Sequence, residues 1–141
     1  MILSFKPQFK EPILIGSKIH TIREDKNNRW SVGKIIHFAT GVRTKAYEQF
    51  DEGACKGVQV IEIEEMIMCA AEYCFVHKFI DPKSNIKHFK TFCVKIDNRK
   101  LSTDEIKALA KNDGFADANK FFEWFNCNFK GKIIHWTDFR Y

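Results

Sequence analysis

The sequence predicts an α+β fold in which a sheet curls into a small barrel, and three features indicate it. Residues up to about 100 resemble a series of β-strands, because runs rich in β-branched and aromatic residues alternate with polar or glycine-containing turns. Two helical patterns follow within residues 102–129, and a last β-rich run closes the chain. Many strands, two consecutive helices and a final strand are typical of α+β domains.

The composition predicts one globular domain spanning residues 1–141. Of these residues 45% are hydrophobic and 29% are charged, which excludes a disordered or low-complexity chain. The net charge of +5 favours an anionic partner. No apolar run approaches the roughly 18 residues of a membrane span, so we expect no membrane partner. The 5 cysteines are scattered without metal-ligand spacing, so we expect reduced thiols, a cytoplasmic location and no metal or other cofactor.

The first half of the chain contains short predicted elements. Residues 9–15 predict a brief helix, because Pro12 is tolerated in a first turn and Gly16 follows as a terminator. Residues 48–53 are interpreted as an acidic loop excursion. Strands are expected over residues 1–5, 18–23 and 34–38, with residues 42–47 continuing the third of them.

The second half predicts longer elements. Residues 58–68, 75–80 and 88–96 are interpreted as strands, the last two separated by a turn at 81–85. Ser102 and Glu105 fit a capping box, which predicts a helix ending near Asp113 and Gly114. A second helix is expected over 118–129, with Trp124 and its phenylalanines packed in the core, a stop at Gly131 and a closing strand over 132–137.

The segment from Gly16 to Arg23 carries the most chemistry. Lys18, Thr21 and Arg23 combine an amine, a hydroxyl and a planar donor fork, groups that suit an anionic or acyl substrate. A solvated strand face explains the same alternation of Thr21 and Arg23 without any chemistry.

This segment is similar to a known family. Gly16-x-Lys18-x-x-Thr21-x-Arg23, followed by Trp30-x-x-Gly33, resembles the signature of the ASCH superfamily, whose members adopt a PUA-like β-barrel. Asp113-Gly114-Phe115, Glu123-Trp124-Phe125 and His135-Trp136-Thr137-Asp138 resemble the helical and terminal segments of bacterial ASCH-like proteins. The resemblance spans most of the chain, and residues 39–100 form a longer middle region than the compact members have.

The resemblance implies a PUA-like mixed β-barrel with a cleft that binds RNA or a nucleoside. One branch of the family, the N4-acetylcytidine amidohydrolases, uses a Lys, a Thr and a Glu to remove an acyl group. Lys18 and Thr21 match the first two residues, and Asp113 stands at the position of the Glu. On this analogy Thr21 attacks the acyl carbonyl, Lys18 takes its proton, Asp113 orients Lys18 or assists the leaving amine, and Arg23 holds the site or stabilises charge.

Further candidate binding residues flank this segment. Trp30 could stack on a base, or it could cover the core as a tryptophan before a glycine turn commonly does. Lys34 and Arg43 could bind phosphates, although a solvated strand face explains them equally. The 5 histidines show no ligand spacing and are interpreted as structural.

The predicted function is therefore binding of RNA or a modified nucleoside in the cleft, with or without hydrolysis of an acyl amide. Two alternatives stay open: an N4-acetylcytidine-type amidohydrolase as the main role, and a β-barrel module that binds proteins. Hydrolysis would require Lys18 and Thr21, whereas binding alone would not need their reactivity.

Overall fold

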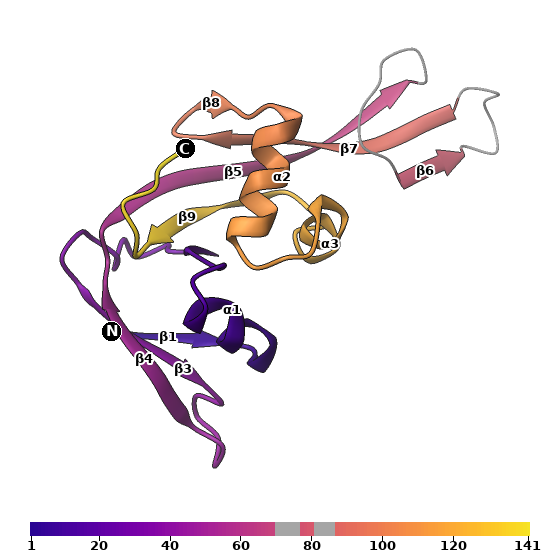
Figure 1. Ribbon diagram of the computed structural model, residues 1–141. Helices are drawn as coiled ribbons and strands as arrows, with labels where there is room; N and C mark the ends of the chain where they lie inside the picture. Colours follow the sequence, from indigo (N-terminus) through magenta and orange to yellow (C-terminus); the bar gives the residue numbers. More distant parts are fainter. Residues whose placement is uncertain (70–76, 81–86) are drawn as a thin grey trace.

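Two β-sheets form the framework of the protein (Figure 1). The computed structural model describes residues 1–69, 77–80 and 87–141, with side chains over 1–67 and 91–141. The smaller sheet has the strand order β1-β3-β4 and comprises β1 (Ile2–Phe5), β3 (Ile35–Thr40) and β4 (Glu48–Ala54). Its β1 and β3 are parallel, and β3 and β4 are antiparallel.

The larger sheet is antiparallel throughout and has the order β2-β9-β5-β7-β6, with β8 paired to β7. Its strands are β2 (His20–Arg23), β5 (Gly57–Cys69), β6 (His77–Ile80), β7 (Lys87–Ile96), β8 (Arg99–Lys100) and β9 (Phe129–His135). The mixed α+β class is confirmed. Within the described residues the strands form two sheets with no closed barrel found, so the predicted barrel is not seen.

The chain passes directly from one sheet into the other at Cys55 and Lys56. The Cys55 N–H donates to the Lys34 carbonyl over 2.8 Å and extends the β3–β4 ladder. The next N–H, of Lys56, donates to the His135 carbonyl over 2.7 Å and extends the β5–β9 ladder. The ladders of the two sheets therefore meet at two adjacent residues of the chain.

Helices cover one side of each sheet. The 3-10 helix η1 (Pro7–Phe9) and α1 (Lys10–Leu14) follow β1, and α2 (Thr103–Asn112) and α3 (Ala118–Trp124) pack on the larger sheet (Figure 1). The predicted capping box at Ser102 and Glu105 begins α2. Among the described residues, no helix has the length and apolar character needed to cross a membrane.

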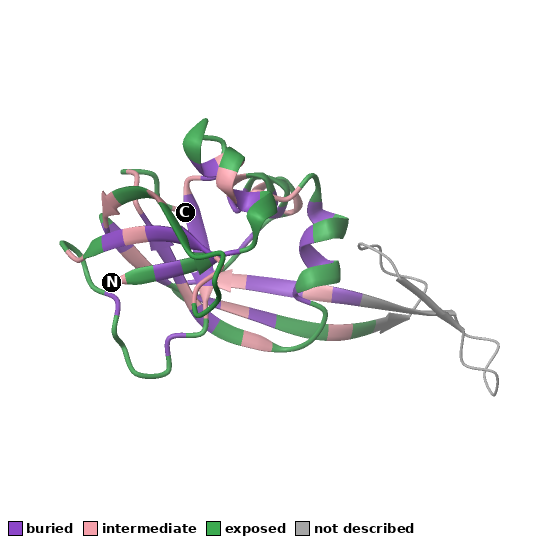
Figure 2. Cartoon of the chain, turned by 90° about the horizontal axis from the view of Figure 1, so that it is seen from below, coloured by how far each residue is buried: buried purple, intermediate pink, exposed green. Residues whose placement is uncertain are grey.

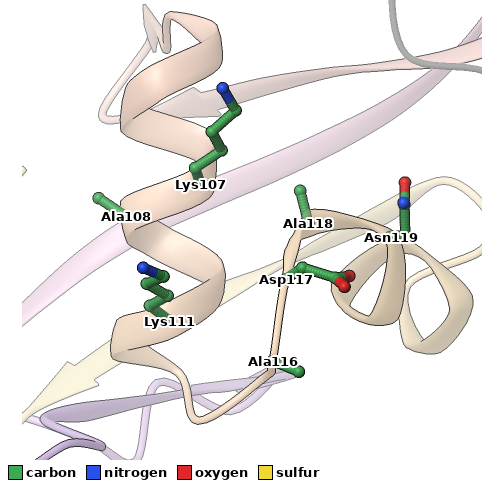
Figure 3. A pocket seen from close by; sticks show the side chains of 7 residues that line it. All are labelled: Lys107, Ala108, Lys111, Ala116, Asp117, Ala118 and Asn119. Atoms are coloured by element: carbon green, nitrogen blue, oxygen red, sulfur yellow. The ribbon is translucent and has the colours of Figure 1, made fainter.

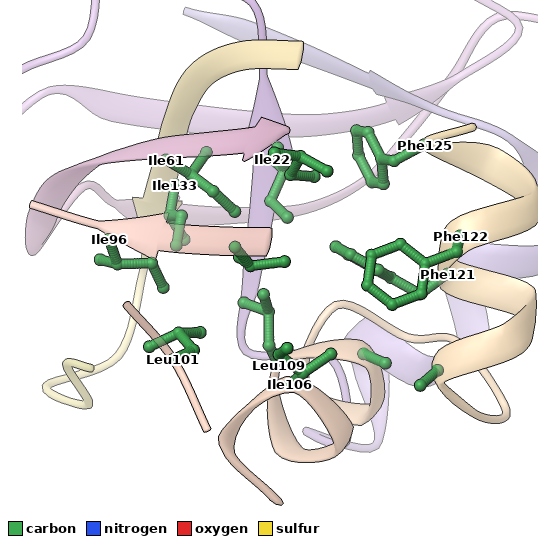
Figure 4. Packing of buried hydrophobic residues seen from close by; sticks show 14 residues of the cluster. Ile22, Ile61, Ile96, Leu101, Ile106, Leu109, Phe121, Phe122, Phe125 and Ile133 are labelled. Carbon is green, nitrogen blue, oxygen red and sulfur yellow. The ribbon is translucent and has the colours of Figure 1, made fainter. Parts of the chain in front are cut away.

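The main core lies between the larger sheet and helices α2 and α3 (Figure 4). Ile61 and Ile63 of β5 point into it, while Glu64 on the alternate face is exposed, as the period of two in a strand requires. The helices contribute Leu109 and Phe121, both fully buried. This alternation of buried and exposed residues is visible along the strands in Figure 2.

A second core lies beside the smaller sheet. It contains Leu3, Phe5, Phe9, Ile13, Trp30, Ile36, Phe38, Cys55 and Ile134. Strand β9 serves both cores, because Ile133 packs into the main core and its neighbour Ile134 into the second.

Residues 42–47 do not continue a strand, contrary to the sequence prediction. They form turns, because Gly41 (φ +60°) and Arg43 (φ +68°) adopt left-handed backbone that a strand cannot accommodate. Strand β4 then occupies the segment predicted as an acidic excursion. Of the later elements, the predicted turn at 81–85 and residues 75–76 lie outside the described residues.

The predicted helix over 118–129 is too long. Helix α3 ends at Trp124, and Phe129 belongs to β9, where it pairs with Ile63. Gly131 is therefore a strand residue and no helix stop. A Cβ at that position would lie 2.5 Å from the Arg23 carbonyl oxygen, so the close approach of β2 requires the glycine.

Candidate active site

A small cavity lies where β2 meets the end of α2. It has a volume of about 20 Å³, room for at least one water molecule or a group of similar size. Four residues that the sequence singled out line it, namely Lys18, Thr21, Arg23 and Asp113. Aromatic and aliphatic side chains complete the wall: Phe5, Phe9, Ile22, Phe115, Trp124 and Phe125. The fold thus joins Lys18 to a residue 95 positions away.

The backbone fixes Lys18 between the ends of two helices. Its N–H donates to the Pro12 carbonyl over 2.9 Å, and the N–H of the next residue, Ile19, donates to the Asn112 carbonyl over 3.0 Å. The Lys18 Nζ donates to Asp113 Oδ1 over 2.7 Å and also to the Asp113 carbonyl oxygen. A cation at the C-terminus of α2 is favourable, because the helix dipole is negative there.

Gly114 leaves room for the Lys18 side chain. Its φ of +85° is the left-handed conformation that commonly ends a helix, and Phe115 N donates back to the Ala110 carbonyl over 2.9 Å. A Cβ on Gly114 would lie 3.0 Å from Lys18 Cδ and 3.2 Å from Phe9 Cδ1. The turn that ends α2 therefore also shapes the site.

The Lys18–Asp113 ion pair is buried almost completely, with residue exposures of 2% and 4%. Burial lowers the pKa of Lys18, the Asp113 carboxylate partly opposes that shift, and the Arg23 cation reinforces it. Burial alone would raise the pKa of Asp113, but Lys18 and His20 beside it bring that pKa below the ordinary value. A perturbed, charged pair at the wall of a cavity is typical of functional sites.

Arg23 is held at the edge of the cavity. Its Nη2 donates to the Ser4 carbonyl over 2.6 Å, and its Cζ lies 5.2 Å from the centre of the Phe5 ring. Burial lowers the pKa of Arg23, with Asp113 opposing the shift. The guanidinium therefore acts as a fixed cation near Lys18 and Thr21.

Thr21 and His20 are adjacent in β2 but have different surroundings. Thr21 is 2% exposed and lines the cavity. His20 Nδ1 lies 3.5 Å from Asp113 Oδ1, and its Nε2 lies 2.7 Å from the Tyr141 hydroxyl. The sequence offers no signal for either contact, because nothing in the spacing of His20 and Tyr141 links them to Asp113.

The other predicted binding residues do not line this cavity. Trp30 is 6% exposed and packs in the second core, and its backbone N–H donates to Asp25 Oδ2 over 3.2 Å. The Lys34 Nζ donates to the Arg29 carbonyl. Arg43 is exposed in the turn between β3 and β4.

Trp124 is the aromatic residue that the sequence placed wrongly. Predicted to lie in the core, it is 40% exposed at the end of α3. Its ring meets Phe9 and Phe115 edge to face, each at 5.8 Å, and the Lys6 Nζ lies 4.4 Å from its centre. Trp124 and Phe115 line the small cavity and also an outer hollow of about 460 Å³, so they separate the two spaces.

Another hollow of about 460 Å³ lies between α2 and α3 (Figure 3). Its polar wall consists of exposed Lys107, Lys111, Asp117 and Asn119, and it contains none of the residues that the sequence selected. Water can satisfy these groups without a ligand. The buried ion pair makes the smaller cavity the stronger candidate, despite its size.

The described residues contain no group of three or more His, Cys, Asp or Glu side chains that could hold a metal ion. Comparisons with protein-family models, curated proteins and solved structures found no match.

Proposed function

We propose that the cavity at Lys18, Thr21 and Asp113 hydrolyses an acyl amide carried by a nucleobase, on a nucleoside or within RNA. The observation that supports this most is the burial of the Lys18–Asp113 pair against a cavity that Thr21 also lines. Burying a charge without a partner costs roughly several kcal/mol of free energy. An amine whose pKa is lowered by burial is what a lysine general base requires.

In the first step Thr21 attacks the acyl carbonyl carbon. Lys18 accepts the hydroxyl proton in its deprotonated form, which its lowered pKa makes more populated, and the new C–O bond pushes the carbonyl electrons onto oxygen. Arg23 supplies a positive charge near this oxyanion. The C–N bond then breaks, the Lys18 ammonium gives its proton to the leaving amine, and Thr21 carries the acyl group as an ester.

In the second step water attacks the ester. Lys18 takes a proton from that water, the C–O bond to Thr21 breaks, and the proton returns to the threonine oxygen. The products are a carboxylic acid and the free enzyme. Asp113 orients Lys18 in both steps, which fits its contact of 2.7 Å with Nζ.

The two neighbouring spaces fit the two parts of such a substrate. The inner cavity of about 20 Å³ has room for a water-sized group and would have to widen for even a small acyl group, whereas the outer hollow of about 460 Å³ is larger than a nucleobase requires. Trp124 and Phe115 line both spaces, so a base that took the place of the Lys6 ammonium on Trp124 would lie next to the opening of the inner cavity. Side chains at this boundary would have to move to admit the acyl group.

We further propose that the chain is an ASCH-type protein, in which the two sheets joined at Cys55 and Lys56 correspond to the PUA-like barrel. The motif from Gly16 to Arg23 supports this, together with the approach of Asp113 to Lys18. The free thiols of Cys55, Cys93 and Cys127 are compatible with a reducing compartment such as the cytoplasm.

A turnover assay tests the proposal. The protein is incubated with N4-acetylcytidine, free and within a short RNA, and the deacylated product is followed by mass. We expect turnover by the wild type and a fall in kcat of at least about 100-fold in Thr21→Val, which keeps the shape of the side chain and removes the nucleophile.

Thr137→Val is the matched control, because Thr137 lies after β9 and does not line the cavity. Wild-type turnover in Thr21→Val would overturn the proposed nucleophile. Salt-sensitive binding of RNA without turnover of either substrate would overturn hydrolysis and leave nucleic-acid binding as the function.

A further inference from the structure

A chain of polar contacts runs from the ion pair to Tyr141. Asn112 Nδ2 donates to the Tyr141 hydroxyl oxygen over 3.0 Å, and that hydroxyl lies 2.7 Å from His20 Nε2. On the other side of the imidazole, Nδ1 lies 3.5 Å from Asp113 Oδ1, which is longer than a good hydrogen bond, and it has no other hydrogen-bond partner among the described residues. His20 thus links Tyr141 to the carboxylate that holds Lys18.

The donors and acceptors give this chain one direction. The Asn112 amide nitrogen can only donate, so the Tyr141 oxygen accepts from it, and the hydroxyl proton has a partner when it points at His20 Nε2. An imidazole that accepts at Nε2 carries its proton at Nδ1 when it is neutral. The opposite tautomer would point the Nδ1 lone pair at the Asp113 carboxylate, which repels it.

We propose that His20 is a positioning residue for Asp113, held by Tyr141 and Asn112 in the neutral tautomer protonated at Nδ1. The Nδ1–H faces Asp113 Oδ1 across 3.5 Å between the heavy atoms, and its attraction for the carboxylate favours the orientation that meets Lys18. The contribution of His20 to catalysis rests on the proposed hydrolase function, but its tautomer and its effect on Lys18 do not.

The surroundings of His20 keep the ring neutral. The ring is fully buried, and burial is the main reason that its pKa lies below the ordinary value. The charged groups that face it are Asp113 and Lys18, whose effects on this pKa oppose each other. His135 packs 5.2 Å away, ring centre to ring centre, and within the described residues neither of its nitrogens has a hydrogen-bond partner.

Tyr141 is well placed to remain a donor. Burial raises the pKa of its hydroxyl, so the proton stays on the oxygen at neutral pH. Its ring packs against His20, His135 and Phe139 at 5.5, 6.2 and 4.9 Å between ring centres. Tyr141→Phe preserves these ring contacts and removes the hydroxyl alone.

Nitrogen-15 NMR of the histidine rings tests the tautomer directly. In the wild type we expect His20 to be protonated at Nδ1 and unprotonated at Nε2. In Tyr141→Phe we expect a mixture of tautomers. Tyr47 is an exposed tyrosine outside these polar contacts, so Tyr47→Phe should leave the wild-type signals. A wild-type ring protonated at Nε2, or an unchanged ring in Tyr141→Phe, overturns the proposal.

Titration of the Lys18 side chain by NMR tests the positioning role. Loss of the donor at His20 weakens the hold on Asp113, so we expect a lower Lys18 pKa in Tyr141→Phe and in His20→Leu. We expect the wild-type value in His20→Asn, whose amide nitrogen can replace Nδ1–H. An unchanged or raised Lys18 pKa in Tyr141→Phe, the variant least expected to unfold, overturns the role.

Kinetics separate this inference from the proposed function. If the protein hydrolyses N4-acetylcytidine, Tyr141→Phe lowers kcat about tenfold and leaves KM within about twofold. If no substrate is turned over, the proposed function fails while both NMR tests still decide the role of His20. Turnover with a wild-type pH profile in Tyr141→Phe overturns the role of His20 alone.

Discussion

Lys18 and Asp113 depend on each other for their stability in the folded protein, because each would be an isolated buried charge without the other. We predict that Lys18→Met lowers the free energy of unfolding by about 3–5 kcal/mol, because the Asp113 carboxylate loses its partner. Urea denaturation measures this change. Lys18→Met combined with Asp113→Leu should recover much of the loss, since the charge itself is then removed.

The exposed pair of Lys10 and Glu48 provides the control, with 2.6 Å between Nζ and Oε1. Lys10→Met should change the free energy of unfolding by no more than about 1 kcal/mol, because water screens that pair. Equal small losses in Lys10→Met and Lys18→Met would contradict the account of the buried ion pair.

His135 gives the protein a predictable sensitivity to acid. Burial, with the Arg140 cation adding to it, lowers the pKa of His135 to about 3, while an unfolded histidine has its ordinary value near 6.5. The unfolded chain therefore binds more protons than the folded chain between these two values. Stability falls as pH decreases through that window, by up to about 1.4 kcal/mol per pH unit from this residue.

His135→Phe removes this titration and keeps an aromatic ring beside His20 and Tyr141. We expect the dependence of unfolding free energy on pH to become shallower between pH 6 and pH 4, roughly. Urea denaturation at several pH values measures it. The same slope in the variant and the wild type would show that His135 is not responsible.

Among the elements, the turn after α2 has two roles: it ends the helix and it leaves room for the Lys18 side chain. Gly114 ends the helix in left-handed backbone at φ +85°, and Gly33 has nearly the same φ, +88°, with open space around it. We predict that Gly33→Ala costs about 1 kcal/mol of backbone strain alone. Gly114→Ala should cost at least about 1 kcal/mol more, because its Cβ crowds Lys18 and Phe9.

Thermal or urea unfolding of the two glycine variants provides the comparison. Equal costs would show that Lys18 moves aside freely and that Gly114 does not shape the site. A larger cost in Gly114→Ala, accompanied by a changed Lys18 signal in NMR, would agree with the structure.

Local rules predicted those elements whose signals are local. The capping box at Ser102 and Glu105 gave the start of α2, and Gly114 gave its end, because both depend on nearby hydrogen bonds. The boundary between α3 and β9 depended on tertiary contacts. Phe129 has helical spacing from Phe125, but its pairing with Ile63 and the bond from Glu65 N to Asn128 Oδ1 place it in a strand.

In the molecule as a whole, the candidate site combines segments that are far apart in the sequence. Lys18, Thr21 and Arg23 could be selected from one short motif, and Asp113 only through the family resemblance. His20 and Tyr141 could not, because their link depends on how β2, α2 and the residues after β9 meet in space. The prediction that Trp124 lies in the core was wrong for a related reason. Helical spacing shows which residues share a face of the helix, but it does not show which of them other elements cover.

In the proposed mechanism Thr21 carries the acyl group during turnover. The most direct test mixes the protein with N4-acetylcytidine, stops the reaction with acid within the first turnover and maps the peptides by mass. We predict an acetyl ester on Thr21 in the wild type and none on the same peptide of Thr21→Val. Turnover that continues in Thr21→Val, with no acetyl group on Thr21 in the wild type, would show that Thr21 is not the nucleophile.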